Sequence, residues 1–164
     1  MIGKLGFKGT IILEQYRNDK LFRTYKFPNG VTNVGKDAIL DSYFRNQAQP
    51  TNWYLGLINN AGYTGLDDAN DTMATHTGWA EATGYSEVTR PEWVTGTAAS
   101  QAITNSTPAT FSITSTLTLK GVFVNSDSTK SGTTGTLWAT ALFAGDIPVA
   151  NGDVLKITYT VNAT

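Results

Sequence analysis

The chain has 164 residues, a length that suits one domain and is too short for two full hydrophobic cores. It contains no cysteine, which excludes disulfides, thiolate metal sites and cysteine nucleophiles. Charged residues make up only 15% and threonine occurs 26 times, so hydroxyl and amide groups supply most of the polarity. We expect one β-rich domain over residues 1–164.

The charges are unevenly distributed along the chain. Residues 1–45 carry eight Lys and Arg against four acids, a net charge of +4, and residues 46–100 carry one Arg against six acids, a net charge of −5. Such a molecule can dock its basic end on an acidic neighbour, although charged faces are often only solvated. The net charge of the whole chain, −1 at pH 7, argues against non-specific electrostatic binding of nucleic acid.

No apolar run approaches the roughly 20 residues of a membrane helix, and the first ten residues show no signal-peptide pattern. We therefore expect a soluble protein made in a cytoplasm, with neither a membrane nor a nucleic acid as partner.

The first predicted element is a hairpin. Two β-rich runs flank Asn18 and Asp19, and the sequence Pro28-Asn29-Gly30 is expected to end the second run at Phe27. Residues 1–27 are therefore interpreted as an N-terminal arm and hairpin.

Residues 33–45 predict the one helix of the chain. Asn33 is its expected N-cap, and an apolar stripe is expected to cover one end or edge of a sheet. The stripe consists of Ile39, Leu40, Tyr43 and Phe44.

The next segment, 53–58, has the sequence WYLGLI and is apolar at both alternating positions, which predicts a strand buried on both faces.

Residues 59–96 predict a loop-rich excursion, because Gly, Pro and Thr break the segment into short pieces. It nevertheless contains four large rings, which is typical of ordered structure. Buried rings would form a satellite core, exposed rings would make an adhesive surface, and both can hold between identical subunits. The four residues are Tyr63, Trp79, Tyr85 and Trp93.

Residues 109–164 are strongly β in pattern. A strand is predicted from Ala109 that Gly121 interrupts, followed by a surface loop at 126–135 and a strand at 136–143. After a reversal at Pro148 and 151–153, the last strand, 153–162, is predicted to turn its alternate apolar residues inward, namely Leu155, Ile157, Tyr159 and Val161. The predicted fold is a mainly β antiparallel sandwich or barrel, jelly-roll-like, with one short helix and a long aromatic-rich loop region.

Candidate catalytic groups are few. His76 is the only histidine and lies in no known catalytic motif. The aromatic loop region holds six candidates for the carboxylate pair of a glycoside hydrolase, although loop acids are usually solvated. They are Glu81, Glu87, Glu92, Asp67, Asp68 and Asp71. The acidic run 67–71 lacks the residue order of an EF-hand and is interpreted as a cap or turn. We expect no enzyme, no catalytic residue, no metal and no cofactor.

The segment NWYLGLINNAGYTGLDDANDTMATHTGWAEATGYSEVTRPEW, with FPNGVTNVGKDAILDSYF before it and GTTGTLWATALF and GDVLKITYT after it, resembles a set of small virion structural proteins of tailed bacteriophages. The likeness spans nearly the whole chain and contains no catalytic signature. It implies a non-enzymatic particle component, above all a capsid decoration (cement) protein, which in such phages commonly sits on the outer head as a trimer. The implied partners are the major capsid protein and further copies of the chain, and the implied location is the outer capsid surface of the virion.

Two other functions stay open. The chain could be a receptor- or carbohydrate-binding module of a phage tail or head fibre, with exposed rings that stack on sugars. It could also be a small hydrolase that uses the loop acids.

The interface hypothesis that goes with decoration assigns the basic N-terminal residues to the capsid or a neighbouring subunit, and the aromatic loop to the oligomer. The residues concerned are Lys4, Lys8, Arg17, Lys20, Arg23, Lys26, Tyr63, Trp79, Tyr85 and Trp93.

Overall fold

The computed structural model describes residues 6–164 and opens with the predicted hairpin. Strands β1 (Phe7–Arg17) and β2 (Lys20–Val31) are antiparallel, and Asn18 and Asp19 between them have φ angles of 51° and 60°. Asn and Asp tolerate this left-handed backbone, which a two-residue hairpin turn with strand-like twist requires. The hairpin prediction is confirmed.

The predicted end of the hairpin at Phe27 is wrong, because β2 continues through Pro28 to Val31. On its second side, β2 pairs with β8 (Leu137–Val149) only at Gly30 and Val31. Since proline lacks an N–H donor, it is tolerated where one edge of a strand is not part of a ladder. The sequence Pro28-Asn29-Gly30 therefore lies inside the strand instead of ending it.

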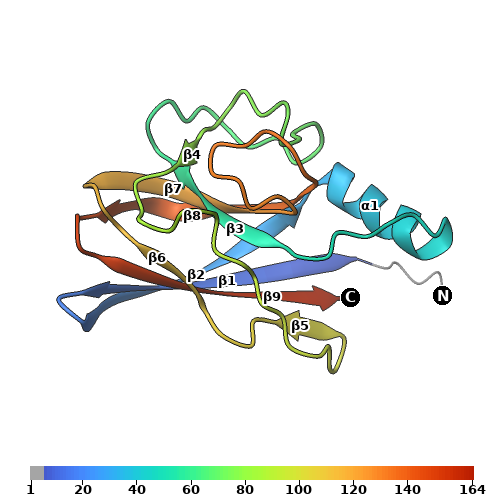
Figure 1. Ribbon diagram of the computed structural model, residues 1–164, viewed down its shortest axis with the longest axis horizontal. Coiled ribbons are helices and arrows are strands. Elements are labelled where there is room, and N and C mark those ends of the chain that lie inside the picture. Colours follow the sequence, from blue (N-terminus) through green and yellow to red (C-terminus); the bar gives the residue numbers. More distant parts are fainter. Residues whose placement is uncertain (1–5) are drawn as a thin grey trace.

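All strand pairs are antiparallel, and the sheet order is β4-β3-β7-β8-β2-β1-β9-β5, with β6 also on β9. Figure 1 shows two layers, in which β3, β7 and β8 lie above β1, β2 and β9. Strand β2 joins the layers, because it pairs with β1 over most of its length and with β8 at its end. The prediction of a mainly β antiparallel sandwich is confirmed. The remaining strands are β3 (Tyr54–Asn59), β4 (Glu81–Ala82), β5 (Ala102–Thr104), β6 (Ala109–Ser112), β7 (Leu117–Asn125) and β9 (Val154–Ala163).

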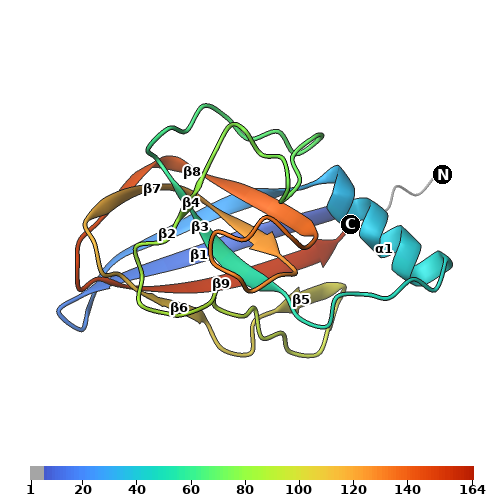
Figure 2. The ribbon, with the colours of Figure 1, turned by 45° about the horizontal axis from the view of Figure 1, so that its top comes forward.

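Hydrophobic side chains fill two spaces, one between the layers and one outside the upper layer. In β7, Val122 and Val124 belong to the main core, whereas Phe123 belongs to a second cluster with Ile58, Met73, Trp79 and Leu137. Alternate residues of a strand point to opposite faces, so the second cluster lies on the far side of β3 and β7. Loop residues 59–80 cover this side (Figure 2). The prediction that residues 53–58 form a strand buried on both faces is confirmed.

The strand predicted from Ala109 to Gly121 is wrong in its boundaries. Strand β6 ends at Ser112 and pairs with β9, whereas β7 begins at Leu117 and pairs with β3 and β8. Gly121 lies inside β7 at a bulge, where an added Cβ would be 2.2 Å from the carbonyl oxygen of Ala141. This glycine therefore permits a close approach of two strands and does not interrupt one.

The last two strands agree better with the sequence pattern. Strand β8 extends past the predicted end at residue 143 and contains Pro148, which pairs with Thr118. The reversal at 151–153 is present, with Gly152 at φ 91°. In β9, the inward direction predicted for the alternate apolar residues is confirmed, since Leu155, Ile157, Tyr159 and Val161 are all buried.

Helix α1 (Asn33–Phe44) is confirmed, but its N-cap is Thr32, whose Oγ1 accepts a hydrogen bond of 3.0 Å from the Gly35 amide. The helix packs on β8 through its first turn, where a Cβ on Gly35 would lie 2.6 Å from the carbonyl oxygen of Trp138.

The predicted burial of the apolar stripe is wrong for most of its residues. Leu40, Tyr43 and Phe44 are 50%, 81% and 76% exposed, and only Ile39 packs on the core. The physical reason is geometric: the C-terminal half of α1 projects from one end of the sandwich (Figure 1).

Candidate functional site

The tip of the β1–β2 hairpin extends beyond the rest of the sandwich (Figure 1). Residues 18–24 are all exposed, and among them Leu21 and Phe22 expose 53% and 46% of their surface. A register shift between Gln15 and Tyr16 pairs Tyr16 with Leu21 and Gln15 with Arg23, so Phe22 is the extra residue of a β-bulge. Bulges re-aim a side chain, and here the bulge separates the ring of Phe22 from the regular ladder.

Two guanidinium groups lie over the Phe22 ring. Those of Arg17 and Arg23 are 4.5 and 5.0 Å from the ring centroid, distances that are typical of cation–π contacts. Lys20 is exposed beside them. The structure thus brings two of the predicted basic residues together over one aromatic ring at the hairpin tip, and a third, Lys20, is the register partner of Arg17.

A buried carboxylate anchors the base of this tip. Asp153, 1% exposed, accepts hydrogen bonds of 2.7 and 2.8 Å from Arg17 Nε and Nη2 and one of 2.7 Å from Gln15 Nε2. The Arg17 hydrogen bond, aided by the amide of Ala150 and by Gln15, lowers the pKa of Asp153 to about 2 against the cost of burial. The base of the tip is therefore tied to the β8–β9 turn through Arg17.

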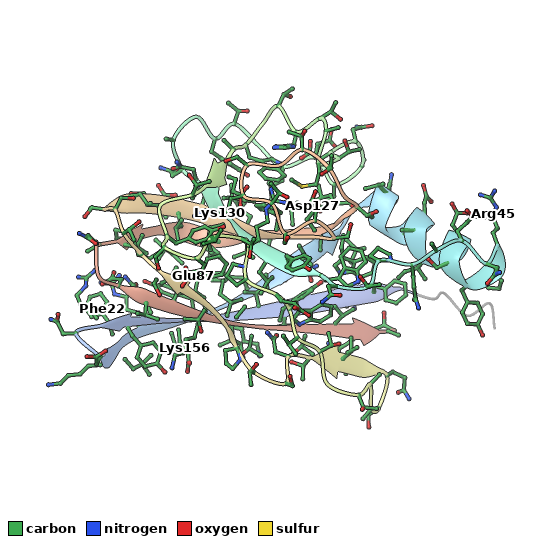
Figure 3. All side chains as sticks on the ribbon, in the orientation of Figure 1. Phe22, Arg45, Glu87, Asp127, Lys130 and Lys156 are labelled. Carbon is green, nitrogen blue, oxygen red and sulfur yellow. The ribbon has the colours of Figure 1, made fainter. Side chains whose placement is uncertain are left out.

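The other predicted basic residues lie elsewhere. Lys26 is the register partner of Ile12, so the two side chains lie on the same, outer face of the sheet. Lys8 lies four residues before Ile12 on β1, and it therefore points to that face too. Lys4 lies outside the described residues. The sequence analysis missed Lys156, whose ammonium lies 4.7 Å from the ring centroid of Tyr16 and whose register partner is Glu14 (Figure 3). Its outward position in the alternation of β9 was the signal that could have identified it.

The aromatic residues predicted for the interface are mostly core residues. Trp79, Tyr85 and Trp93 are 4%, 3% and 7% exposed, and only Tyr63 is partly accessible. Trp79 packs on Phe123 with ring centroids 5.0 Å apart and donates its indole N–H to Asp71 at 2.9 Å. These three rings are therefore core residues, in line with the first of the two interpretations. Because they are buried, they do not provide an exposed interface.

The carboxylates of the hydrolase hypothesis are bound to other groups of the protein. Glu81 receives hydrogen bonds of 3.0 and 2.8 Å from Arg90, and the side chains of this ion pair are 6% and 0% exposed. Glu87 accepts from the Ser112 amide, and Glu92 accepts from Asn52. A general acid needs a free approach to its substrate, whereas both oxygens of the Glu81 carboxylate accept hydrogen bonds from Arg90 in a buried ion pair.

The acidic run 67–71 makes internal caps, as predicted. Asp67 accepts from Asn70 and from the Ala69 amide, which lowers its pKa, and Asp71 accepts from Trp79 and the Asp67 amide. His76 stacks on the Trp79 ring at 4.0 Å. Within residues 6–164, no group of three or more His, Asp or Glu side chains is placed to hold a metal ion.

Comparisons with known proteins identify no relative: no family model matches the sequence, and no curated protein matches it. In the described part of the chain, no helix combines the length and apolar character that spanning a membrane requires.

Proposed function

We propose that this chain is a capsid decoration protein of a bacteriophage, which binds the outer head shell through protein–protein contacts and acts without catalysis. The observation that carries the proposal is the hairpin tip, where two arginines lie over an exposed aromatic ring and Lys20 pairs in register with one of them. Arginine and aromatic side chains are enriched in the energetically dominant centres of protein interfaces. The tip is thus suited to dock on an acidic surface of a partner protein.

The anchoring of the tip supports this role. A docking group that is already held in one geometry loses less conformational entropy when it binds, which improves affinity without new contacts. The Arg17–Asp153 ion pair and the Gln15 hydrogen bond supply that rigidity. The proposed partner is the major capsid protein, and clustered positive charge would speed the encounter with an acidic patch on it.

The outer face of the lower layer supports solubility before assembly. Register pairs place Thr10, Thr160 and Thr104 side by side across three strands, with Thr158 one alternation further on. A hydroxyl-rich face with few apolar groups resists premature association. The proposal includes association of three copies on the shell, since several weak contacts made together give strong overall binding; sedimentation equilibrium of the free protein measures whether the trimer forms before docking.

The test uses two variants that each remove two positive charges. The double variant Lys20→Gln/Arg23→Gln changes the tip, and Lys36→Gln/Arg45→Gln changes α1 by the same charge at the opposite end of the molecule, where Arg45 lies in Figure 3. Occupancy on purified heads of the encoding phage, stripped of this protein, is measured over a salt series.

We expect the tip variant to bind roughly tenfold or more weakly and with a flatter salt dependence, because contacts between exposed charges are screened. The α1 variant should bind like the unmodified protein. Equal occupancy for the tip variant and the unmodified protein at every salt concentration would refute docking through the tip.

A further inference from the structure

The end of the sandwich that carries α1 contains a cleft. It lies between the C-terminal half of α1, the following segment 46–53 and the sandwich end where β1 begins and β9 ends. Two adjoining hollows, of about 460 and 400 Å³, share Ile39, Gln49, Pro50 and Trp53. Small-molecule sites usually have volumes of this order. In Figure 3 the labelled Arg45 and Phe22 mark the two opposite ends of the molecule, so the cleft is remote from the hairpin tip.

Aromatic side chains form much of the surface of the cleft. Trp53 lines both hollows and packs on Trp138 with ring centroids 6.2 Å apart. Trp93 and Trp138 contribute only small exposed portions, 7% and 6% of their surface. Tyr43, 81% exposed, contributes from α1. The core holds the tryptophans in place, so the aromatic surface is formed before any ligand binds.

The polar groups around these rings are amides and hydroxyls. Asn46, Gln47 and Gln49 line the cleft together with Ser42 and Thr51, and none of the described residues lining either hollow is charged. This lining contrasts with the hairpin tip, where three cations gather. A ligand with a formal charge would therefore lose its hydration here without gaining a counter-ion from the described lining residues.

Trp53 differs from the other three tryptophans in its hydrogen bonding. Trp79, Trp93 and Trp138 donate their indole N–H groups to Asp71, to the Tyr159 carbonyl and to the Tyr159 hydroxyl. Among residues 6–164, the indole N–H of Trp53 has no hydrogen-bond acceptor, and the atom is not among the fully buried unsatisfied groups. Within the described residues, this donor is therefore unpaired, and it belongs to a residue that lines both hollows.

We infer that this cleft binds a neutral saccharide. The C–H face of a sugar ring packs on aromatic rings, and its hydroxyls both donate and accept, which matches amide side chains and an indole donor. A purely apolar ligand would leave the amides unpaired, and a phosphate or an acidic sugar would find no cation among the described residues that line the cleft. The inference goes beyond the proposed docking function and does not depend on it, because a copy docked through its hairpin tip leaves this end exposed.

The test is a titration of the full-length protein with neutral sugars, followed by the indole N–H signal of Trp53 in two-dimensional NMR. The probes are glucose, galactose, mannose and N-acetylglucosamine with their disaccharides, at up to roughly 50 mM, a range that detects a millimolar Kd. Glucuronic acid serves as the charged comparison. We expect at least one neutral sugar to shift the Trp53 signal with saturation and glucuronic acid to leave it unchanged.

Surface variants distinguish the cleft from other sites, because a change at Trp53 itself disturbs the core. Tyr43→Ala and Gln49→Ala should each weaken binding roughly tenfold, about the effect of losing one stacking or hydrogen-bonding contact. Phe44→Ala is the matched control: Phe44 is 76% exposed next to Tyr43, yet it does not line the cleft, so its Kd should be unchanged.

Three results would overturn the inference. The first is that no neutral sugar shifts the Trp53 signal. The second is that Phe44→Ala weakens binding as much as Tyr43→Ala does. The third is that the Trp53 signal moves on dilution of the protein without sugar, which would show that a second copy covers the cleft. A failure of head binding with sugar binding intact would contradict the proposed function and leave this inference standing.

Discussion

Tyr159 connects several parts of the fold from within the main core. Its buried hydroxyl accepts hydrogen bonds of 2.8 Å from Trp138 Nε1 and 3.0 Å from Asn29 Nδ2, so it joins β9 to β8 and β2. Its backbone carbonyl accepts from Trp93, whose ring lies 4.8 Å away. Burial raises the pKa of this phenol, so the hydroxyl stays neutral. The hydrogen bonds that its oxygen accepts from Trp138 and Asn29 lower the pKa, but by less than burial raises it.

We predict that Tyr159→Phe lowers the free energy of unfolding by about 1–3 kcal/mol, because the buried indole N–H of Trp138 and the partly buried amide of Asn29 lose this acceptor. Urea unfolding measures the change. The control is Tyr25→Phe, which removes a hydroxyl whose partner, Arg23, is exposed at 3.5 Å, and which should change stability by less than about 0.5 kcal/mol. Equal effects of the two variants would show that the buried hydroxyl does not link the layers.

Asp153 makes a second residue-level prediction, about pH. Its pKa falls from 3.8 to about 2 in the folded protein, so the folded state favours the carboxylate. The stability that this group contributes is complete above pH of about 4 and is lost as the pH falls toward 2. Asp153→Asn should therefore lower Tm by several degrees at pH 7, and the difference from the unmodified protein should shrink between pH 4 and pH 2.

Thermal unfolding across this pH range measures the effect. The control is Asp146→Asn, which removes one partner of the exposed Lys120 ion pair and should leave Tm at pH 7 nearly unchanged. A difference between Asp153→Asn and the unmodified protein that stays constant from pH 7 to pH 2 would contradict this account of Asp153.

At the scale of elements, Arg90 holds the loop-rich excursion against the rest of the fold. Besides its ion pair with Glu81, it donates hydrogen bonds of 2.9 Å to the carbonyl oxygens of Asp127 and Gly132, and its guanidinium lies 5.1 Å from the Phe123 ring centroid. The loops at 81–90 and 126–135 are therefore ordered by one buried cation, and not only by their aromatic residues.

We predict that Arg90→Met and Glu81→Gln each destabilise the protein by about 3–5 kcal/mol, since each leaves a buried polar group without its partner. The double variant should lose much less than the sum, because it removes both charges. Unfolding free energies of the four proteins form a double-mutant cycle that measures the coupling. Additive losses would mean that the ion pair does not hold the loops.

At the scale of the whole molecule, the two proposed sites lie at opposite ends and draw on different chemistry. The tip is cationic and protrudes, whereas the cleft is uncharged and concave. We predict that the two sites can be impaired separately. Lys20→Gln/Arg23→Gln should weaken head binding without changing the sugar Kd, and Tyr43→Ala should weaken sugar binding without changing head occupancy. A variant that impairs both activities while it remains folded would show that the ends are coupled.

Local patterns predicted much of the fold. The alternation of Leu155, Ile157, Tyr159 and Val161 and the Asn18-Asp19 turn are properties of a few neighbouring residues, and both are confirmed. The basic hairpin was also visible in the sequence, since Arg17 precedes that turn and Lys20 and Arg23 follow it. In such cases burial or backbone conformation depends on side chains that are close along the chain.

The predictions that failed concern residues whose partners are distant in sequence. Gly121 allows the backbone of Ala141 to come close. Pro28 can lie inside β2 because β8 pairs with β2 only at the later residues Gly30 and Val31. The same distinction holds for the sites. Composition and alternation by themselves determined a β-rich body with a basic hairpin, because these features follow from local spacing. Only the tertiary structure decided that three of the loop rings are buried and that Tyr43 and Trp53 line one cleft, because burial there depends on surfaces which only long-range packing brings together.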